Sequence, residues 1–84
     1  MSHFHFHILN GKNLYDDTGA ELPDIEAAKI EAIRVAGTVL CEGVSAAFWR
    51  GTAWKMVVKD NPELRSGRTF FTLTLSATEE EPFN

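Results

Sequence analysis

The chain has 84 residues, which suits one small domain, and we expect that domain to span residues 1–84. Hydrophobic residues make up 44% of it, enough for one core, whereas eight basic against twelve acidic residues argue against general binding to phosphate backbones. A single cysteine, Cys41, excludes an internal disulfide framework and fits a reducing compartment.

The first predicted element is a β-strand over residues 3–9, where side chains alternate between two faces. Its core face carries Phe4, Phe6 and Ile8, and its outward face carries His3, His5, His7 and Leu9. Asn10-Gly11 follows at once and predicts a hairpin turn, because both residues tolerate positive φ. We therefore expect a return strand over residues 13–16 with Leu14 pointing inward, and a second turn over residues 16–19.

The stretch Leu22–Gly43 is the longest periodic segment and predicts an amphipathic helix. Asp24 can cap its start by accepting a hydrogen bond from a first-turn amide, and Gly43 can end it because glycine readily turns left-handed. At about 100° per residue, one stripe collects the residues that should face the core: Ile25, Ala28, Ala32, Ala36, Val39 and Leu40. The three alanines allow the helix to lie close to the sheet that it covers.

Two further strands are expected after the helix, over residues 53–59 and 69–75. Their inward side chains are Trp54, Met56, Val58, Phe71, Leu73 and Leu75, and their outward ones are Lys55, Val57, Lys59, Phe70, Thr72 and Thr74. Residues 44–51 fit either an extra turn of helix or a loop whose Phe48 and Trp49 close the end of the core. The acidic tail over residues 77–84 is expected to be flexible.

The order of these elements, β-β-α-β-β, predicts an α+β fold in which one helix packs on one face of a four-stranded, mainly antiparallel sheet. Alternation in every long strand supports this, because a sheet covered on both faces would give continuous apolar runs. The expected core consists of Phe4, Phe6, Trp54, Met56, Phe71 and Leu73.

Four segments of the chain form a pattern that resembles a known family. They are F-H-I-L-N-G at residues 6–11, D-D-T-G-A-E-L-P-D at 16–24, E-A-A-K-I-E-A at 26–32 and W-K-M-V-V-K-D at 54–60. The chain is thereby similar to short bacterial proteins that constitute a domain of unknown function. This resemblance covers most of the chain and implies a small bacterial α+β protein without an established activity.

The resemblance also implies which single residues are characteristic of the family. His7 matches its recurrent histidine, Trp54 its third-strand tryptophan, and Gly19, Pro23 and Asp24 the turn before its helix. His3 and His5 lie where the family pattern usually has other residues. The turn over residues 60–67 is longer than the corresponding family turn.

His3, His5 and His7 are the most suggestive polar side chains, because alternation places all three on one strand face. Neighbouring imidazoles can share a zinc or copper ion, so one hypothesis is a metal-binding protein. The sequence offers no cysteine pair or second histidine motif as further ligands. The other interpretation is that the three residues are polar positions on a solvated sheet face.

The outward sheet face also combines cations with an aromatic residue, as in several single-stranded nucleic-acid binders. The net charge of −4 and the lack of an RNP-like motif argue against nucleic acid, which we keep as an alternative partner. A further interpretation is that the outward sheet face is buried against a second copy of the chain, because two-fold dimers are the commonest oligomers. The residues expected at such a contact are Leu9, Val57, Phe70 and Trp49.

The sequence therefore favours a non-enzymatic module that forms a homodimer or binds another protein through its open sheet face or an edge strand. No motif predicts a catalytic group or a cofactor. The start of the chain lacks a signal-peptide pattern, and no apolar run approaches the ~18 residues of a membrane span. We expect a cytoplasmic protein that does not enter a membrane.

Overall fold

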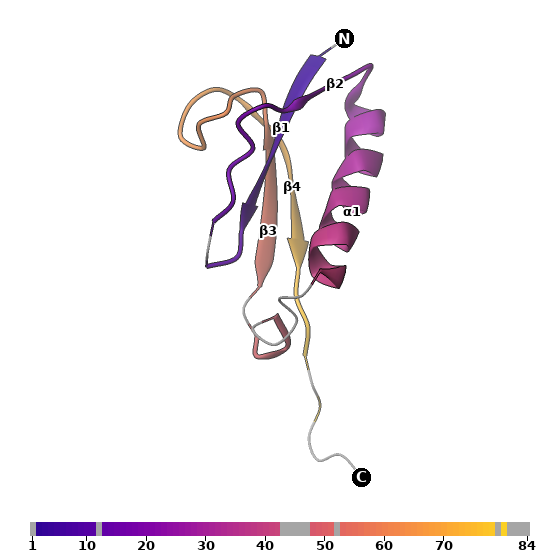
Figure 1. Cartoon of the computed structure of the whole chain (residues 1–84), viewed down its shortest axis with the longest axis vertical. Helices are drawn as coiled ribbons and strands as arrows, with labels where there is room; N and C mark the ends of the chain where they lie inside the picture. Colours follow the sequence, from indigo (N-terminus) through magenta and orange to yellow (C-terminus); the bar gives the residue numbers. More distant parts are fainter. Residues whose placement is uncertain (1, 12, 43–47, 52, 79, 81–84) are drawn as a thin grey trace.

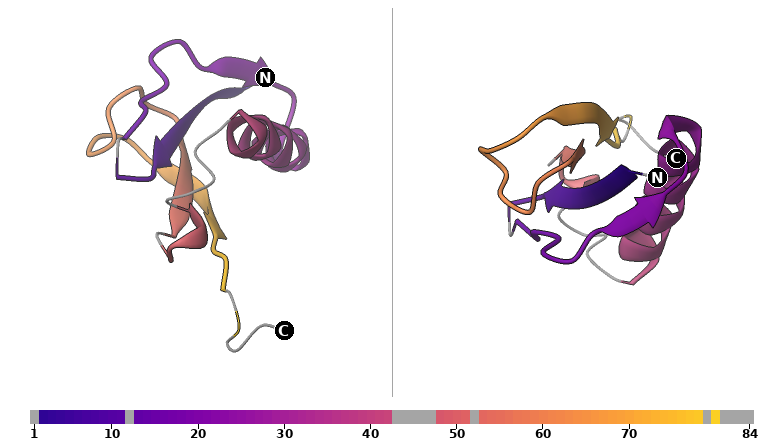
Figure 2. Two further views of the ribbon diagram at one scale, coloured as in Figure 1. Left: turned by 60° about the horizontal axis from the view of Figure 1, so that its bottom comes forward. Right: turned by 90° about the horizontal axis from the view of Figure 1, so that it is seen from above.

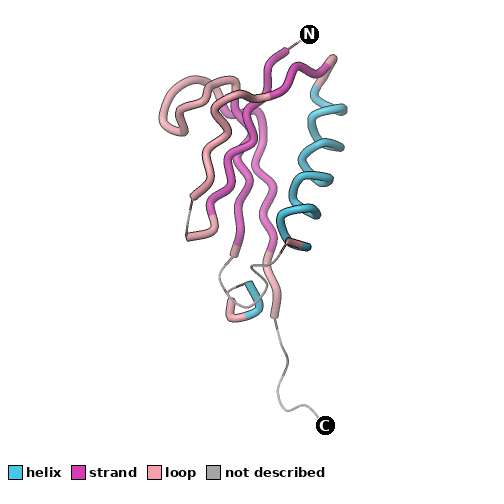
Figure 3. Tube along the Cα trace, viewed as in Figure 1, coloured by secondary structure: helices cyan, strands magenta, loops and turns pink. Residues whose placement is uncertain are grey.

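A computed structural model describes residues 2–11, 13–42, 48–51, 53–78 and 80 of the chain. The elements follow in the order β1 (Ser2–Leu9), β2 (Ala20–Leu22), α1 (Ile25–Cys41), β3 (Trp54–Lys59) and β4 (Thr69–Leu75). The strands form one antiparallel sheet in the order β2-β1-β3-β4, and α1 lies along one face of it (Figure 1). The predicted α+β class and the β-β-α-β-β order are confirmed (Figure 3).

β1 lies inside the sheet, and its two halves have different partners. Residues 2–4 pair with β2, whereas residues 5–9 pair with β3. The predicted return strand over residues 13–16 is wrong: Leu14 forms an isolated bridge to Ile8, and its side chain is 52% exposed rather than inward. The side chain of Asp16 explains the difference, because its Oδ2 accepts the N–H of Phe6 at 3.0 Å and so replaces a strand carbonyl.

α1 begins where the sequence predicts. The N–H of Ala27 donates to Oδ1 of the cap residue Asp24 at 2.8 Å, and Glu26 places negative charge in the first turn. The alanines of the predicted stripe, Ala28, Ala32 and Ala36, are all buried. Their small side chains bring α1 close to β2 and β3, against which it packs. The predicted stop at Gly43 lies outside the described residues.

The core lies between α1 and the sheet, as predicted. Its buried hydrophobic residues are Phe4, Phe6, Ile8, Ala28, Ala32, Ala36, Trp54, Met56 and Val58. Phe71 and Leu73, which were also expected in the core, are only half-buried. Because α1 packs against β2 and β3, it leaves the helix-side face of β4 partly uncovered.

A β-bulge changes the direction of one side chain in β4. Val58 pairs with Phe71 and Lys59 with Thr69, so Phe70 is an extra residue between the two pairs. Its ring lies 4.9 Å from that of Phe4, centroid to centroid, on the core side of the sheet. The prediction that Phe70 points outward is therefore wrong, since a strict two-residue alternation does not survive a bulge.

The segment before β3 contains one aromatic residue that packs against the core and one that is exposed to solvent. Phe48 packs edge-on against Trp54, with ring centroids 5.9 Å apart, whereas Trp49 is 57% exposed. Of the two aromatic residues expected to close this end of the core, Phe48 packs against it and Trp49 does not. Residues 44–47 of the predicted segment lie outside the described residues. So do residues 79 and 81–84 of the predicted tail. Within the described part of the chain, no helix is long and apolar enough to cross a membrane.

Candidate functional site

Two loops lie over the sheet face opposite α1: the first contains residues 10–11 and 13–19, and the second contains residues 60–68 (Figure 2). His5, His7 and Lys59 are buried on this face. Nζ of Lys59 donates a hydrogen bond to Oγ1 of Thr69 at 3.1 Å. His3 stays exposed at the end of the row. The expectation of a solvated, open sheet face is therefore wrong over β1, because the loops between the strands fold back onto it.

His7 connects both loops to β1. The backbone N–H of Asp16 donates to its Nδ1 at 3.1 Å, and its Nε2 lies 2.9 Å from the carbonyl oxygen of Asn61. A carbonyl only accepts, so Nε2 carries the proton and donates it, and the ring is the neutral Nε2–H tautomer. The imidazole is fully buried (0% exposed) and both its nitrogens are used.

His3 and His5 bind the first loop in a similar way. Nδ1 of His5 donates to the carbonyl oxygen of Asp16 at 2.7 Å, and Nε2 of His3 donates to that of Thr18 at 2.7 Å. The three imidazoles therefore act as loop anchors. His7 has no lone pair left for a metal ion, and within the described residues no group of three or more His, Cys, Asp or Glu side chains has metal-binding geometry.

The carboxylate of Asp16 organises the first loop. Its Oδ1 accepts the N–H of Gly19 at 2.9 Å, closing the predicted turn, while Oδ2 accepts the N–H of Phe6. Burial raises the pKa of this carboxyl, but the hydrogen bonds from the N–H groups of Phe6 and Gly19, together with the electrostatic effect of the neighbouring imidazoles, lower it more. The net result is a pKa below the ordinary value of 3.8, so the loop is held by a charged group.

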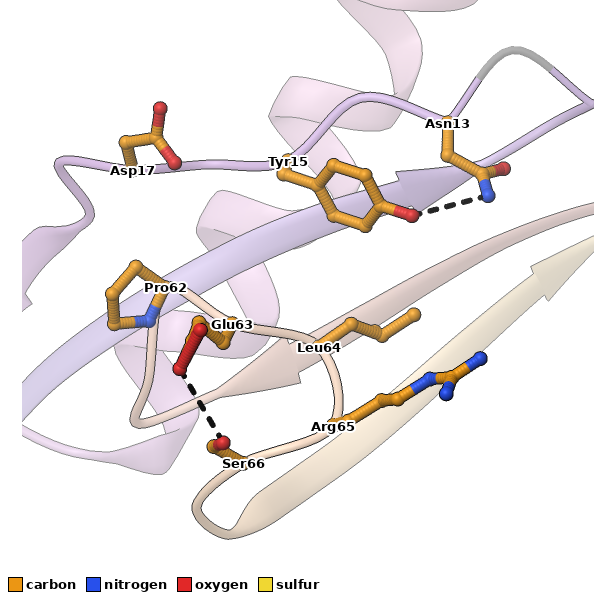
Figure 4. Close-up of a pocket in the computed structure, with 8 residues that line it drawn as sticks. All are labelled: Asn13, Tyr15, Asp17, Pro62, Glu63, Leu64, Arg65 and Ser66. Carbon is orange, nitrogen blue, oxygen red and sulfur yellow. Dashed lines mark hydrogen bonds between the residues drawn. The ribbon is translucent and has the colours of Figure 1, made fainter.

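A groove opens between the two loops, with a volume of about 500 Å³ (Figure 4). Asn13, Tyr15 and Asp17 line it from the first loop, and Pro62, Glu63, Leu64, Arg65 and Ser66 from the second. The ring of Tyr15 stands edge-on to His7, with centroids 5.8 Å apart. The buried histidine thus supports one wall of the groove directly and anchors the other wall through Asn61.

A second, apolar groove of about 300 Å³ lies between α1 and β4. Ile33 of the helix is 65% exposed there and faces Phe71 and Leu73 of the strand. β4 is the last strand of the sheet, so one of its edges is open. The groove therefore lies beside a strand that has no further strand on its outer side within the described part of the chain.

The four residues predicted at an interface do not form one patch. Leu9 and Val57 are half-buried on the loop-covered face, Phe70 is half-buried against the core, and Trp49 is exposed in the segment before β3. Of the outward lysines predicted to face nucleic acid, Lys55 is exposed but Lys59 is buried. The structure therefore offers no basic sheet face over β1 and β3 on which bases would stack.

Sequence reasoning missed the residues that line the two grooves. Tyr15 and Arg65 lie in segments expected to be a strand and a turn, and Ile33 lies outside the stripe of helix residues expected to face the core. The unusual length of the turn over residues 60–67 was a usable signal, because long ordered loops in small domains often carry a binding surface.

Comparison with known proteins gives one match. Residues 3–76 match the family model of a domain of unknown function, DUF6894. No curated protein and no solved structure shows a significant match to the chain. The match spans both loops and all four strands apart from Ser2, the first residue of β1.

Proposed function

The chain belongs to the DUF6894 family, a domain of unknown function, and we propose that it is a non-catalytic module that forms a homodimer through the outer edge of β4. The observation that carries this proposal is the combination of an open seven-residue edge strand with an apolar groove beside it. A strand edge with free N–H and C=O groups is a ready template for another strand.

The two edges of the sheet differ in a way that favours β4. β2 has only three residues, and a short edge offers few backbone groups. β4 has seven residues, T-F-F-T-L-T-L, and none is charged. Exposed edges in monomeric proteins are usually protected by charged residues or proline, and β4 contains neither. Its composition therefore fits a strand that acquires a partner.

A second copy complements β4 through its side chains as well as its backbone. When two identical strands pair antiparallel about a two-fold axis, both helices lie on the same face of the joined sheet. Phe71 and Leu73 of one copy then come beside the same residues of the other, next to Ile33. Contact across the axis would bury the half-exposed apolar side chains that α1 leaves uncovered.

The charges that flank β4 also suit an antiparallel pair. Arg68 precedes the strand and Glu80 follows it, while the strand itself is neutral. Antiparallel pairing places Arg68 of the two copies at opposite ends of the joined strands. A parallel pair would place like charges together.

Sedimentation velocity over a range of protein concentrations tests this proposal. We expect a reversible dimer, and we expect Ile33→Glu to raise the dissociation constant at least about tenfold, because a charge would enter the apolar groove. Ile30→Glu is the matched control: Ile30 is 71% exposed on the same helix but does not line the groove. A monomer at all concentrations, or equal weakening by both variants, would contradict the proposal.

Nitroxide labels identify which edge is used. With Cys41 replaced by serine, we expect labels at Thr72→Cys of two copies to lie within about 20 Å of each other, because both flank the proposed axis. Labels at Glu21→Cys on β2 should be separated by roughly 30 Å or more, since three strand spacings lie between β2 and β4 in each copy. The reverse pattern would assign the dimer to the β2 edge.

A further inference from the structure

The two nitrogens of His7 respond differently to a second proton. Nε2 donates to the carbonyl oxygen of Asn61 at 2.9 Å, and it keeps its proton when the ring becomes an imidazolium. Nδ1 accepts the backbone N–H of Asp16 at 3.1 Å through the lone pair that a second proton would need. An imidazolium at this position therefore keeps its hydrogen bond to the second loop and loses its hydrogen bond to the first.

The other two imidazoles of β1 can be protonated without losing their contact with the first loop. Nδ1 of His5 and Nε2 of His3 each donate to a loop carbonyl oxygen at 2.7 Å. A second proton goes to the opposite nitrogen of each ring, and Nδ1 of His3 lies 3.9 Å from a carboxylate oxygen of Glu21. Of the three histidines, His7 is thus the one whose protonation breaks its hydrogen bond to the first loop.

A positive charge on His7 would be buried beside other cations. The imidazole is fully buried, so water does not solvate a charge there while the loops are closed. Its ring stacks on that of His5, with centroids 6.2 Å apart, and the buried Lys59 of β3 is the cross-strand partner of His5. The closed arrangement therefore gives the second proton neither solvent nor a free lone pair.

The acidic groups around His7 already have hydrogen-bond donors. The carboxylate of Asp16 attracts a positive charge, but both its oxygens accept backbone N–H groups. Its pKa lies below 3.8, so it stays charged down to about pH 5. In the second loop, Oδ1 of Asp60 accepts the N–H of Arg68 at 2.7 Å. Tyr15 presents its ring, edge-on to His7 with centroids 5.8 Å apart.

We propose that protonation of His7 at Nδ1 releases the first loop from β1 while the second loop stays bound, so that mild acid opens the groove between the loops. Tyr15 follows His7 to the wall of that groove and precedes Asp16 in the chain, so it moves with the released segment (Figure 4). The device is separate from the proposed dimer contact, because His7 and the residues that line the groove lie outside β4 and α1.

The size of the effect follows from proton linkage. A histidine in contact with water takes up its second proton near about pH 6.5. Below that pH the open form holds one proton that the closed form lacks, so the open population rises by up to about tenfold per pH unit. Between about pH 7.5 and about pH 5 the opening constant should therefore rise about 30-fold.

Amide hydrogen exchange followed by nitrogen–proton NMR spectra tests this inference on the unmodified chain. We expect the protection factor of the Asp16 N–H, which excludes the direct effect of pH on exchange, to fall about 30-fold over that range. The N–H of Asp60, which donates to the carbonyl oxygen of Arg68, and that of Ala32 in α1 should keep their protection. Constant protection at Asp16, or an equal fall at Asp60 or Ala32, would overturn the proposal.

His7→Gln identifies the group that responds to acid. A carboxamide can accept the N–H of Asp16 and donate to Asn61, but it does not titrate, so the protection of Asp16 should change less than about threefold. His5→Gln is the matched control, because His5 is also buried and also binds the first loop, and it should retain the fall. A retained fall in His7→Gln, or a lost one in His5→Gln, would contradict the assigned role of His7.

Long-range nitrogen–proton spectra of the imidazoles need no variant. At about pH 7.5 we expect Nδ1 of His7 to be unprotonated, and to stay so for as long as the N–H of Asp16 is protected. A proton on Nδ1 while that N–H remains protected would overturn the proposal. These measurements do not depend on dimer formation, so this inference and the proposed function can fail separately.

Discussion

Nε2 of His7 donates a hydrogen bond to the carbonyl oxygen of Asn61, 54 residues further along the chain. The same ring accepts the N–H of Asp16 at its other nitrogen. One buried imidazole therefore satisfies a backbone donor from the first loop and a backbone acceptor from the second. An aliphatic residue at this position would satisfy neither, which explains why a polar side chain stands at a fully buried site.

His7→Phe keeps a ring at this position but removes both hydrogen bonds. We expect a loss of about 2–4 kcal/mol in the free energy of unfolding, because the partly buried N–H of Asp16 and C=O of Asn61 lose their partner. Urea denaturation followed by circular dichroism measures it. His3→Phe is the control, since His3 is exposed, and should cost less than about 1 kcal/mol. Equal costs for the two variants would show that His7 is not the anchor of the loops.

The carboxylate of Asp16 makes stability depend on acid pH. Its pKa in the folded protein lies below the ordinary value of 3.8, so its contribution is complete above that value and is lost as the pH falls through the folded-state pKa. Asp16→Asn has one acceptor oxygen in place of two. We expect it to be less stable at pH 7 and to lose less stability than the parent protein between pH 5 and about pH 2.

The measurement is a series of urea denaturation curves across that pH range. Asp17→Asn is a suitable control, because Asp17 follows directly in the same loop and is exposed. Its stability should depend on pH as that of the parent protein does. A parallel pH dependence for Asp16→Asn and the parent protein would contradict the assigned role of Asp16.

Gly19 has a left-handed backbone conformation, and neighbouring atoms leave no space for a side chain on it. Its φ is +70°, and a Cβ there would lie 2.8 Å from the carbonyl oxygen of Phe4 and from the ring of His3. Gly11 has a φ of +94° but no atom within 4 Å of the corresponding Cβ position. Both alanine variants strain the backbone, and Gly19→Ala should be less stable than Gly11→Ala by about 1–2 kcal/mol because of the added clash. Thermal unfolding of the two variants checks this, and an equal loss would contradict it.

The parts of the fold that depend on local sequence were predictable. Asp24 caps a helix through an amide three residues away, and the alanines at 28, 32 and 36 recur at helical spacing. The predicted inward residues Phe4, Phe6, Trp54 and Met56 are all buried. Each of these assignments depends on residues within a few positions of one another, where periodicity and capping rules apply.

The candidate sites depended on contacts that no local rule describes. The second strand was misplaced because a side chain, that of Asp16, takes the role of a strand carbonyl for Phe6. The burial of His5 and His7 follows from loops that return from distant parts of the chain. Phe70 was assigned to the wrong face because a bulge adds one residue to β4. Sequence periodicity identifies the faces of a strand but not what later covers them.

The position of β1 has a consequence for how the chain folds. Its second half pairs with β3, which is separated from it in the sequence by β2 and α1. While β3 is still missing, residues 5–9 have no strand beside them on that side, and Phe6 and Ile8 lack part of their packing. Pairing over such a long separation in sequence slows folding. The β1–β3 pairing therefore raises the mean sequence separation of the contacts that the chain must form.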